Sequence, residues 1–162
     1  MLRSLLARLL GFEQEIDELK RTIDDLRWDN AFGMWTRAAF LQFCRIMPRG
    51  MRTVAFIDLD DVHGLNRRLG YSEVDRRVQA IFSISLRSSD IVARWYSGDE
   101  IVILFDADRD GADRKISELQ ASANSQEISF AYEIGEWDVG KRDITDLVED
   151  LSDRIFENNT KE

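Results

Sequence analysis

The sequence predicts an α+β fold in which helices cover both faces of a mainly antiparallel sheet. Short apolar runs predict the strands: Val54–Ile57 is typical of a buried strand, and Ile91–Tyr96 with Ile101–Phe105 is typical of a β-hairpin. Ile128–Ile134 alternates apolar and polar residues, as a half-covered strand does. Segments with helical spacing separate these runs, and a long helical segment precedes them. We therefore expect one globular domain behind an N-terminal helix.

The first 28 residues predict a coiled coil that makes the chain a dimer. Their apolar residues are spaced alternately three and four apart, the a/d pattern of about three and a half heptads. These residues are Leu2, Leu5, Leu9, Phe12, Ile16, Leu19, Ile23 and Leu26. The alternative is a single amphipathic helix that packs on the domain's own surface, but so narrow a seam favours two strands. The domains expected are a dimerisation helix over residues 1–28 and a globular domain over residues 29–162.

Helices and strands follow one another through the globular part. Thr36 is the expected N-cap of a helix from Arg37 to about Ile46, and Thr53–Asp58 is the first expected strand. A short helix over Asp61–Leu69 ends near a glycine, and Ser72 is the expected N-cap of the next helix. The other expected elements are the hairpin Ile91–Phe105, a helix beginning at Asp108 or Asp110, the strand Ile128–Ile134 and a helix from Asp143 to about Asn158.

The composition excludes several classes of protein. A net charge of −9 argues against a general nucleic-acid binder, because such proteins need a basic stripe along the polyanion. The single cysteine, Cys44, excludes an internal disulfide and a thiolate zinc site. No apolar run is long enough to predict a transmembrane helix, so we expect a cytoplasmic protein with no membrane span.

Two acidic clusters predict a binding site for a divalent cation. Asp58, Asp60 and Asp61 follow the first strand, whereas Asp99 and Glu100 lie at the tip of the predicted hairpin. Carboxylates at a strand end and at a hairpin tip can converge on one point in space, and hard cations prefer oxygen ligands. We therefore expect a divalent cation to bind there together with a phosphate-bearing substrate.

Three motifs follow one another on the expected elements. The chain matches the pattern D-x-L-T-G-L-x-N-R-R-x-F at Asp29, Gly33, Arg37 and Phe40, and it keeps the D…N…D spacing of a second pattern at Asp58, Asn66 and Asp75. The third motif is Ser97-Gly98-Asp99-Glu100-Ile101. In this order the motifs resemble the GGDEF domain, the catalytic domain of diguanylate cyclases, over about Asp29–Asn158. The resemblance implies a palm-like fold for the globular part.

The resemblance also implies an activity. Two such domains, each holding one GTP, meet face to face in a dimer, and the 3′-hydroxyl of each GTP attacks the α-phosphate of the other. The products are cyclic di-GMP and pyrophosphate. By position, Asp58, the Leu59 carbonyl and Asp99 would hold Mg²⁺, and Glu100 would lie near the attacking 3′-hydroxyl as the second catalytic carboxylate beside Asp99.

Further residues are implied to bind nucleotides. Asn66 and Asp75 would form hydrogen bonds with guanine, and Ser97 and Gly98 would let the backbone approach the phosphates. The tetrapeptide Arg87–Asp90 fits the family's R-x-x-D motif, so Arg87 and Asp90 are candidates for an inhibitory site that binds cyclic di-GMP. The alternative is that Arg87 and Asp90 form a surface ion pair.

Departures from the family pattern leave a second function open. Ser97 replaces a glycine, the lysine of a Tyr-x-Ala-Lys pattern is missing after Phe156, and Arg94 lies one residue further from the signature than usual. The extra residue is expected to shift the hairpin register or to insert a bulge. The alternative is thus a degenerate domain that binds GTP, cyclic di-GMP or a protein partner without catalysis. A third hypothesis is a cyclic-nucleotide polymerase that has the same fold and uses a nucleotide with a different base.

Overall fold

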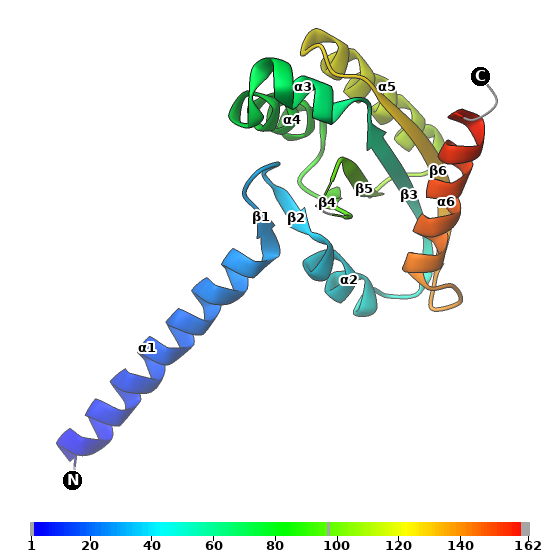
Figure 1. The fold of residues 1–162 in the computed structure, drawn as a ribbon. Helices are drawn as coiled ribbons and strands as arrows, with labels where there is room; N and C mark the ends of the chain where they lie inside the picture. The colour runs from blue at the N-terminus through cyan, green and yellow to red at the C-terminus, as the bar shows by residue number, and fades with distance from the viewer. Residues whose placement is uncertain (1, 97, 160–162) are drawn as a thin grey trace.

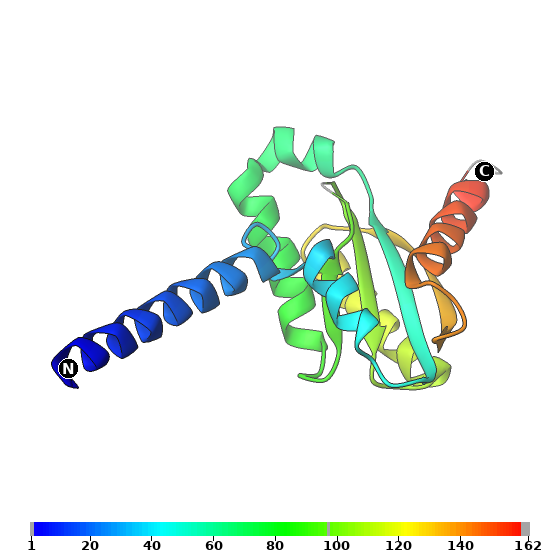
Figure 2. The ribbon, with the colours of Figure 1, turned by 90° about the horizontal axis from the view of Figure 1, so that it is seen from below.

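The computed structural model describes residues 2–96 and 98–159 and shows a six-stranded sheet with helices on both faces (Figures 1 and 2). The strands are β1 (Trp28–Asp29), β2 (Met34–Thr36), β3 (Gly50–Leu59), β4 (Ile91–Arg94), β5 (Glu100–Phe105) and β6 (Phe130–Val139). The helices are α1 (Leu2–Arg27), α2 (Arg37–Arg45), α3 (Val62–Leu69), α4 (Tyr71–Ser85), α5 (Arg109–Ser125) and α6 (Ile144–Asn159). The predicted α+β fold, with its N-terminal helix, is confirmed. Within the described residues, none of the helices has the length and hydropathy that a membrane span requires.

The strand order is β1-β2-β4-β5-β3-β6, and every neighbouring pair is antiparallel except β2 with β4. Strand β3 lies between β5 and β6, and β6 pairs with it along its whole length, from Gly50 opposite Val139 to Leu59 opposite Phe130. On the other side, Asp58 at the end of β3 lies opposite Glu100 at the start of β5. The sheet therefore brings the two acidic segments of the sequence to one edge.

Alternate residues of β3 enter two separate cores, because successive side chains of a strand point to opposite faces of the sheet. Ala55 and Ile57 pack in the core that α3, α4 and α5 cover. Val54 and Phe56 pack in the core that α2 and α6 cover. Asp58 continues the second series, and so does Glu100, which precedes Val102 by two residues on β5. Both carboxylates therefore lie on the face of α2 and α6.

Pairing within the sheet explains where the strand predictions were too short. Strand β3 begins at Gly50 rather than at Thr53, and β6 continues past Ile134 to Val139, because the two strands hydrogen-bond over ten residues each. The very short strands β1 and β2 were not predicted, since two or three residues carry no periodic signal. Their pairing depends on β4, which lies far along the chain.

The junction of α3 and α4 corrects one expected cap. Helix α4 begins at Tyr71, and its N-cap is Gly70 with no side-chain hydrogen bond, so Ser72 is not the cap. Gly70 has φ +83°, a conformation that glycine adopts without a Cβ clash, and its N–H closes α3 by donating to the Asn66 carbonyl. One glycine thus ends α3 and starts α4, which fixes the angle between them.

Helix α1 projects away from the sheet (Figures 1 and 2). The described members of the seam are 49–69% exposed: Phe12, Ile16, Leu19, Ile23 and Leu26. Leu2, Leu5 and Leu9 lie outside the residues whose side chains the structure describes. The N-terminal helix is confirmed, and the coiled coil and the dimer stay predictions.

Candidate functional site

Three backbone contacts hold the two acidic segments together at the end of the sheet. Asp58 and Glu100 are cross-strand neighbours, and the Leu59 N–H donates to the Asp99 carbonyl at 3.2 Å. The Trp95 N–H donates to the Glu100 carbonyl at 2.8 Å, which closes the hairpin behind them. The sheet thus brings Asp58, Leu59, Asp99 and Glu100 together at one point.

The electrostatics of this cluster show carboxylates without a compensating charge. Partial burial, followed by the charges of Asp99, Glu100 and Asp60, raises the pKa of Asp58 from 3.8 to about 6. The Oε2 atom of Glu100 is buried and has no hydrogen-bond partner within the described residues. A Cβ added at Gly98 would lie 3.1 Å from that oxygen, so the space beside it depends on glycine. A cation bound here would relieve both costs.

The donor set fits a hard divalent cation. It consists only of oxygen atoms, from the Asp58 and Asp99 carboxylates and the Leu59 carbonyl. Within residues 2–96 and 98–159, no three His, Cys, Asp or Glu side chains are already arranged around a metal position.

The extra hairpin residue neither shifts the register nor inserts a bulge into the described strands. Pairing runs evenly from Ile91 opposite Leu104 to Arg94 opposite Ile101, which corrects the sequence-based expectation. The added residue lies in the turn after Trp95, where connections between strands tolerate length changes. Ser97, a predicted site residue, lies outside the described residues. The positions of Asp58 and Glu100 opposite each other are therefore preserved.

Arg94 anchors the turn to the N-terminal edge of the sheet. Its Nε and one terminal nitrogen donate to the Gly98 carbonyl at 2.9 and 2.7 Å. Its other terminal nitrogen lies 3.2 Å from the Asp29 carboxylate, and its guanidinium stacks on Phe32 at 4.1 Å. Sequence reasoning used Asp29 and Arg94 only as motif landmarks and missed this role. Their motif positions were the only available signal, because 65 residues separate them.

The two predicted guanine contacts lie on α3 and α4. Asn66 on α3 has a buried Oδ1 atom that lacks a hydrogen-bond partner within the described part of the chain. Asp75 on α4 has a raised pKa, because burial and the charge of Asp29 outweigh the attraction of Arg94. Asp75 therefore lies close enough to Arg94 and Asp29 to sense both charges. The Asn66 oxygen therefore retains unused hydrogen-bonding capacity.

In the predicted inhibitory pair, Arg87 and Asp90, the Asp90 carboxylate holds the backbone in place. Asp90 accepts the backbone N–H of Arg87 at 3.0 Å and that of Asp106 at 2.9 Å, one with each carboxylate oxygen. No ion pair between the Arg87 and Asp90 side chains occurs among the described residues, which corrects the surface-pair alternative. Both residues line a cavity of about 490 Å³ that Trp28 and Trp35 also line.

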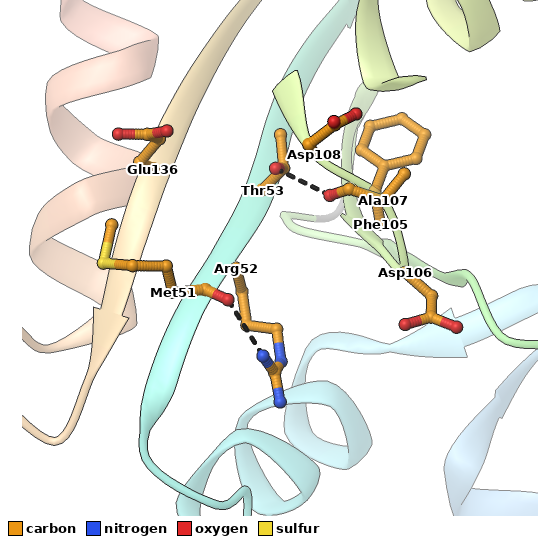
Figure 3. Close-up of a pocket in the computed structure, with 8 residues that line it drawn as sticks. All are labelled: Met51, Arg52, Thr53, Phe105, Asp106, Ala107, Asp108 and Glu136. Atoms are coloured by element: carbon orange, nitrogen blue, oxygen red, sulfur yellow. Dashed lines mark hydrogen bonds between the residues drawn. The ribbon is translucent and has the colours of Figure 1, made fainter. Parts of the chain in front are cut away.

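A different pocket, of about 360 Å³, opens at the far end of β3 (Figure 3). Its lining residues are Met51, Arg52, Thr53, Phe105, Asp106, Ala107, Asp108 and Glu136. The Thr53 hydroxyl donates to the Ala107 carbonyl and the Arg52 guanidinium to the Met51 carbonyl, so these polar groups are already used (Figure 3). None of the predicted site residues lines this pocket, and the candidate site is the acidic end of the sheet.

Comparison with known proteins gives a family match and several structural neighbours. The family model described as "Diguanylate cyclase, GGDEF domain" matches residues 41–141. The diguanylate cyclase SiaD of Pseudomonas aeruginosa, solved with its activator SiaC, has a TM-score of 0.73 and 18% identity, covering 99% of this chain and 70% of that one.

The coiled coil and GGDEF domain of Caulobacter crescentus DgcB, solved with c-di-GMP, has a TM-score of 0.74 and 17% identity, covering 98% and 95% of the two chains. The FimX GGDEF domain of P. aeruginosa has a TM-score of 0.67 and 16% identity, covering 82% and 92%. No curated protein matches the sequence. At these identities the neighbours establish the fold.

Proposed function

Because the chain belongs to the GGDEF family of diguanylate cyclase domains, we propose that it condenses two GTP molecules into cyclic di-GMP and pyrophosphate across a dimer. The observation that carries the proposal is the meeting of Asp58, Asp99 and Glu100 at one end of the sheet. Clustered carboxylates destabilise one another unless a cation compensates them, and the raised pKa of Asp58 reflects burial first and this repulsion second. Because this arrangement destabilises the fold, it favours a role in binding a metal–nucleotide complex.

The carboxylates have distinct tasks in this proposal. Asp58, the Leu59 carbonyl and Asp99 would hold Mg²⁺ or Mn²⁺, which when bound supplies positive charge to the triphosphate. Glu100 would accept a hydrogen bond from the 3′-hydroxyl through its unpartnered Oε2 and take up its proton as the hydroxyl attacks.

Guanine would be recognised by the two helices next to the hairpin. The Asp75 carboxylate suits the N1–H and N2–H groups of guanine, which point side by side at an acceptor. Asn66 offers both a donor and an acceptor, and its acceptor oxygen is unpartnered among the described residues. Gly98, together with Ser97, would leave the backbone open to the phosphates. Base specificity thus depends on side chains, whereas phosphate binding depends on the turn.

The reaction needs two copies of the domain, because each copy holds one substrate. We propose that residues 1–28 form a parallel two-stranded coiled coil and that residues 29–162 are the catalytic domain. Burying each half-exposed seam side chain would stabilise the dimer by roughly 1 kcal/mol per protomer. The solved part of DgcB, whose structure matches 98% of this chain, also combines a coiled coil with a GGDEF domain.

A second function deserves a direct test. The last turn of α6 carries no basic residue, whereas a triphosphate needs positive charge around it. Asp90, expected in the inhibitory pair, already accepts two backbone N–H groups. These observations favour a degenerate domain that binds GTP, cyclic di-GMP or a protein partner and does not turn over.

Product analysis separates the two functions. Purified protein is incubated with GTP and Mg²⁺, and the products are identified by mass spectrometry. We expect cyclic di-GMP from the wild type and none from Asp99→Ala. Asp106→Ala, which removes an exposed carboxylate at the far end of β5, is the matched control and should retain activity. If the wild type binds GTP without any product, the degenerate function is correct; a different cyclic dinucleotide would mean another base specificity.

A further inference from the structure

Four buried side-chain atoms lack a hydrogen-bond partner within the described residues: Arg37 Nε, Asn66 Oδ1, Trp95 Nε1 and Glu100 Oε2. The proposed function uses the Asn66 and Glu100 atoms and leaves the two nitrogen donors unexplained. Most buried polar groups in folded proteins are paired with protein or water, so each exception needs a reason. Two unpaired donors close to an acidic site indicate a missing acceptor.

Arg37 and Trp95 lie on the same face of the sheet as the catalytic carboxylates. Trp95 packs in the core beneath α2 and α6, and its backbone N–H donates to the Glu100 carbonyl at 2.8 Å. Arg37 is the first residue of α2 and follows Thr36, which pairs with Arg94 in the sheet. Side-chain alternation puts Glu100 on this face too. The guanidinium of Arg37 is thus next to the signature hairpin.

Two aromatic rings hold the Arg37 guanidinium in place. Its Cζ lies 4.6 Å from the Trp95 ring centroid and 5.0 Å from that of Tyr96. Trp95 is only 1% exposed and packs edge-to-face on Phe40 at 6.0 Å. Stacking fixes the plane of a guanidinium and leaves its N–H edge free for an acceptor in that plane. The ring of Tyr96, in the lengthened turn, supplies the second stacking contact.

The charge of Arg37 is not compensated by a carboxylate within residues 2–96 and 98–159. The neighbouring Arg94 differs, because it is bound to Asp29 and to the Gly98 carbonyl. Arg37 also occupies the start of α2, where the helix dipole adds positive potential. A half-buried, oriented and unpaired guanidinium is suited to bind an anion.

We propose that Arg37 binds a phosphate group of the nucleoside triphosphate, with Trp95 Nε1 as a second donor on that side of the site. This inference rests on the proposed function, which puts a triphosphate at Asp58, Asp99 and Glu100. One divalent cation leaves a triphosphate with net negative charge beside several carboxylates. A planar guanidinium fork matches phosphate geometry and offsets that repulsion. Arg37 thereby supplies the positive charge that the last turn of α6 lacks.

Binding experiments with substrate fragments test this role. Isothermal titration in Mg²⁺ measures the affinities for inorganic tripolyphosphate and for guanosine. Arg37→Gln should weaken tripolyphosphate binding about tenfold or more and leave guanosine binding unchanged. Arg37→Lys should recover part of the loss, because it keeps the charge without the fork. Arg45→Gln, at the other end of α2, makes the same charge change and should bind like the wild type.

The outcomes separate this inference from the proposed function. Tripolyphosphate binding that depends on Arg37, without any cyclic di-GMP, supports the anion site and contradicts the cyclase. Equal tripolyphosphate affinity in the wild type and Arg37→Gln overturns the inference, and so does a wild type that binds no tripolyphosphate. A parallel loss of guanosine binding would mean that Arg37 only shapes the site, which also overturns it. If Arg37→Gln does not fold, Tyr96→Leu decides: weaker tripolyphosphate binding supports the stacked guanidinium, and unchanged binding contradicts it.

Discussion

Asp58→Asn should stabilise the metal-free protein while abolishing its activity. Burial and neighbouring carboxylates raise the pKa of Asp58 from 3.8 to about 6. The folded chain therefore keeps the Asp58 proton at pH values where the unfolded chain has lost it. Stability falls as the pH rises from about 4 to about 6, and the penalty is constant above that window. An amide carries no charge, so the variant avoids the penalty.

The size of the effect follows from the pKa shift. A shift of this size corresponds to roughly 3 kcal/mol in an unscreened site, and solvent around this half-buried carboxylate reduces it to about 1–2 kcal/mol. For a chain of 162 residues, this raises the melting temperature by about 3–6 °C.

Thermal unfolding with a chelator checks the prediction. At pH 7.5, Asp58→Asn should melt above the wild type, and at pH 4 the two should melt together. Adding Mg²⁺ with GTP should raise the melting temperature of the wild type more than that of the variant, because the variant lacks a carboxylate ligand. If Asp58→Asn melts below the wild type at pH 7.5, or if the difference does not change with pH, the electrostatic account of the cluster is wrong. Asp106→Asn is the control at an exposed position just after β5 and should show neither effect.

Three further predictions concern other parts of the molecule. Replacing Ile16 and Leu19 by Lys should produce a monomer without cyclase turnover, because the charges break the seam; an unchanged sedimentation coefficient would contradict the coiled coil. Arg94→Met should lower turnover at least tenfold, because it frees the turn that carries the signature, and it should also lower the melting temperature, because Asp29 loses its ion-pair partner. Wild-type kinetics would show that the turn holds without it. Gly64→Ala should lower the unfolding free energy by about 1 kcal/mol or more, because its Cβ would lie 2.6 Å from Oδ1 of Asp61, the oxygen that caps α3. Denaturant unfolding measures the loss, and an unchanged midpoint would refute the cap.

Much of the fold was accessible from periodicity. The helical spacing of Val74, Val78 and Ile81 predicted the buried face of α4, and the apolar run around Phe56 predicted the central strand; all four side chains are in the cores. These signals are local, since each depends on residues within a few positions of one another. The spacing of the motifs also indicated the family, because side chains at one site keep their separations along the elements that present them.

Pairing between segments far apart in the chain could not be predicted from the sequence. The strands β1 and β2 exist because β4 pairs with β2, and the hairpin keeps its register because the added residue is absorbed in the turn. The contacts of Arg94 with Asp29 and of Asp106 with Asp90 join segments that no local pattern connects.

By itself the sequence determined which side chains are available: carboxylates at the end of a strand and at a hairpin tip, an apolar heptad seam, and one cysteine without a partner. Only the tertiary structure decided which of them meet. The antiparallel pairing of β3 with β5 puts Asp58 opposite Glu100, and the packing of α2 on the same face brings Arg37 onto Trp95. The reason is physical: charge, burial and unpaired hydrogen bonds depend on distances in space, and these are set by strand register and by packing of elements far apart in the chain.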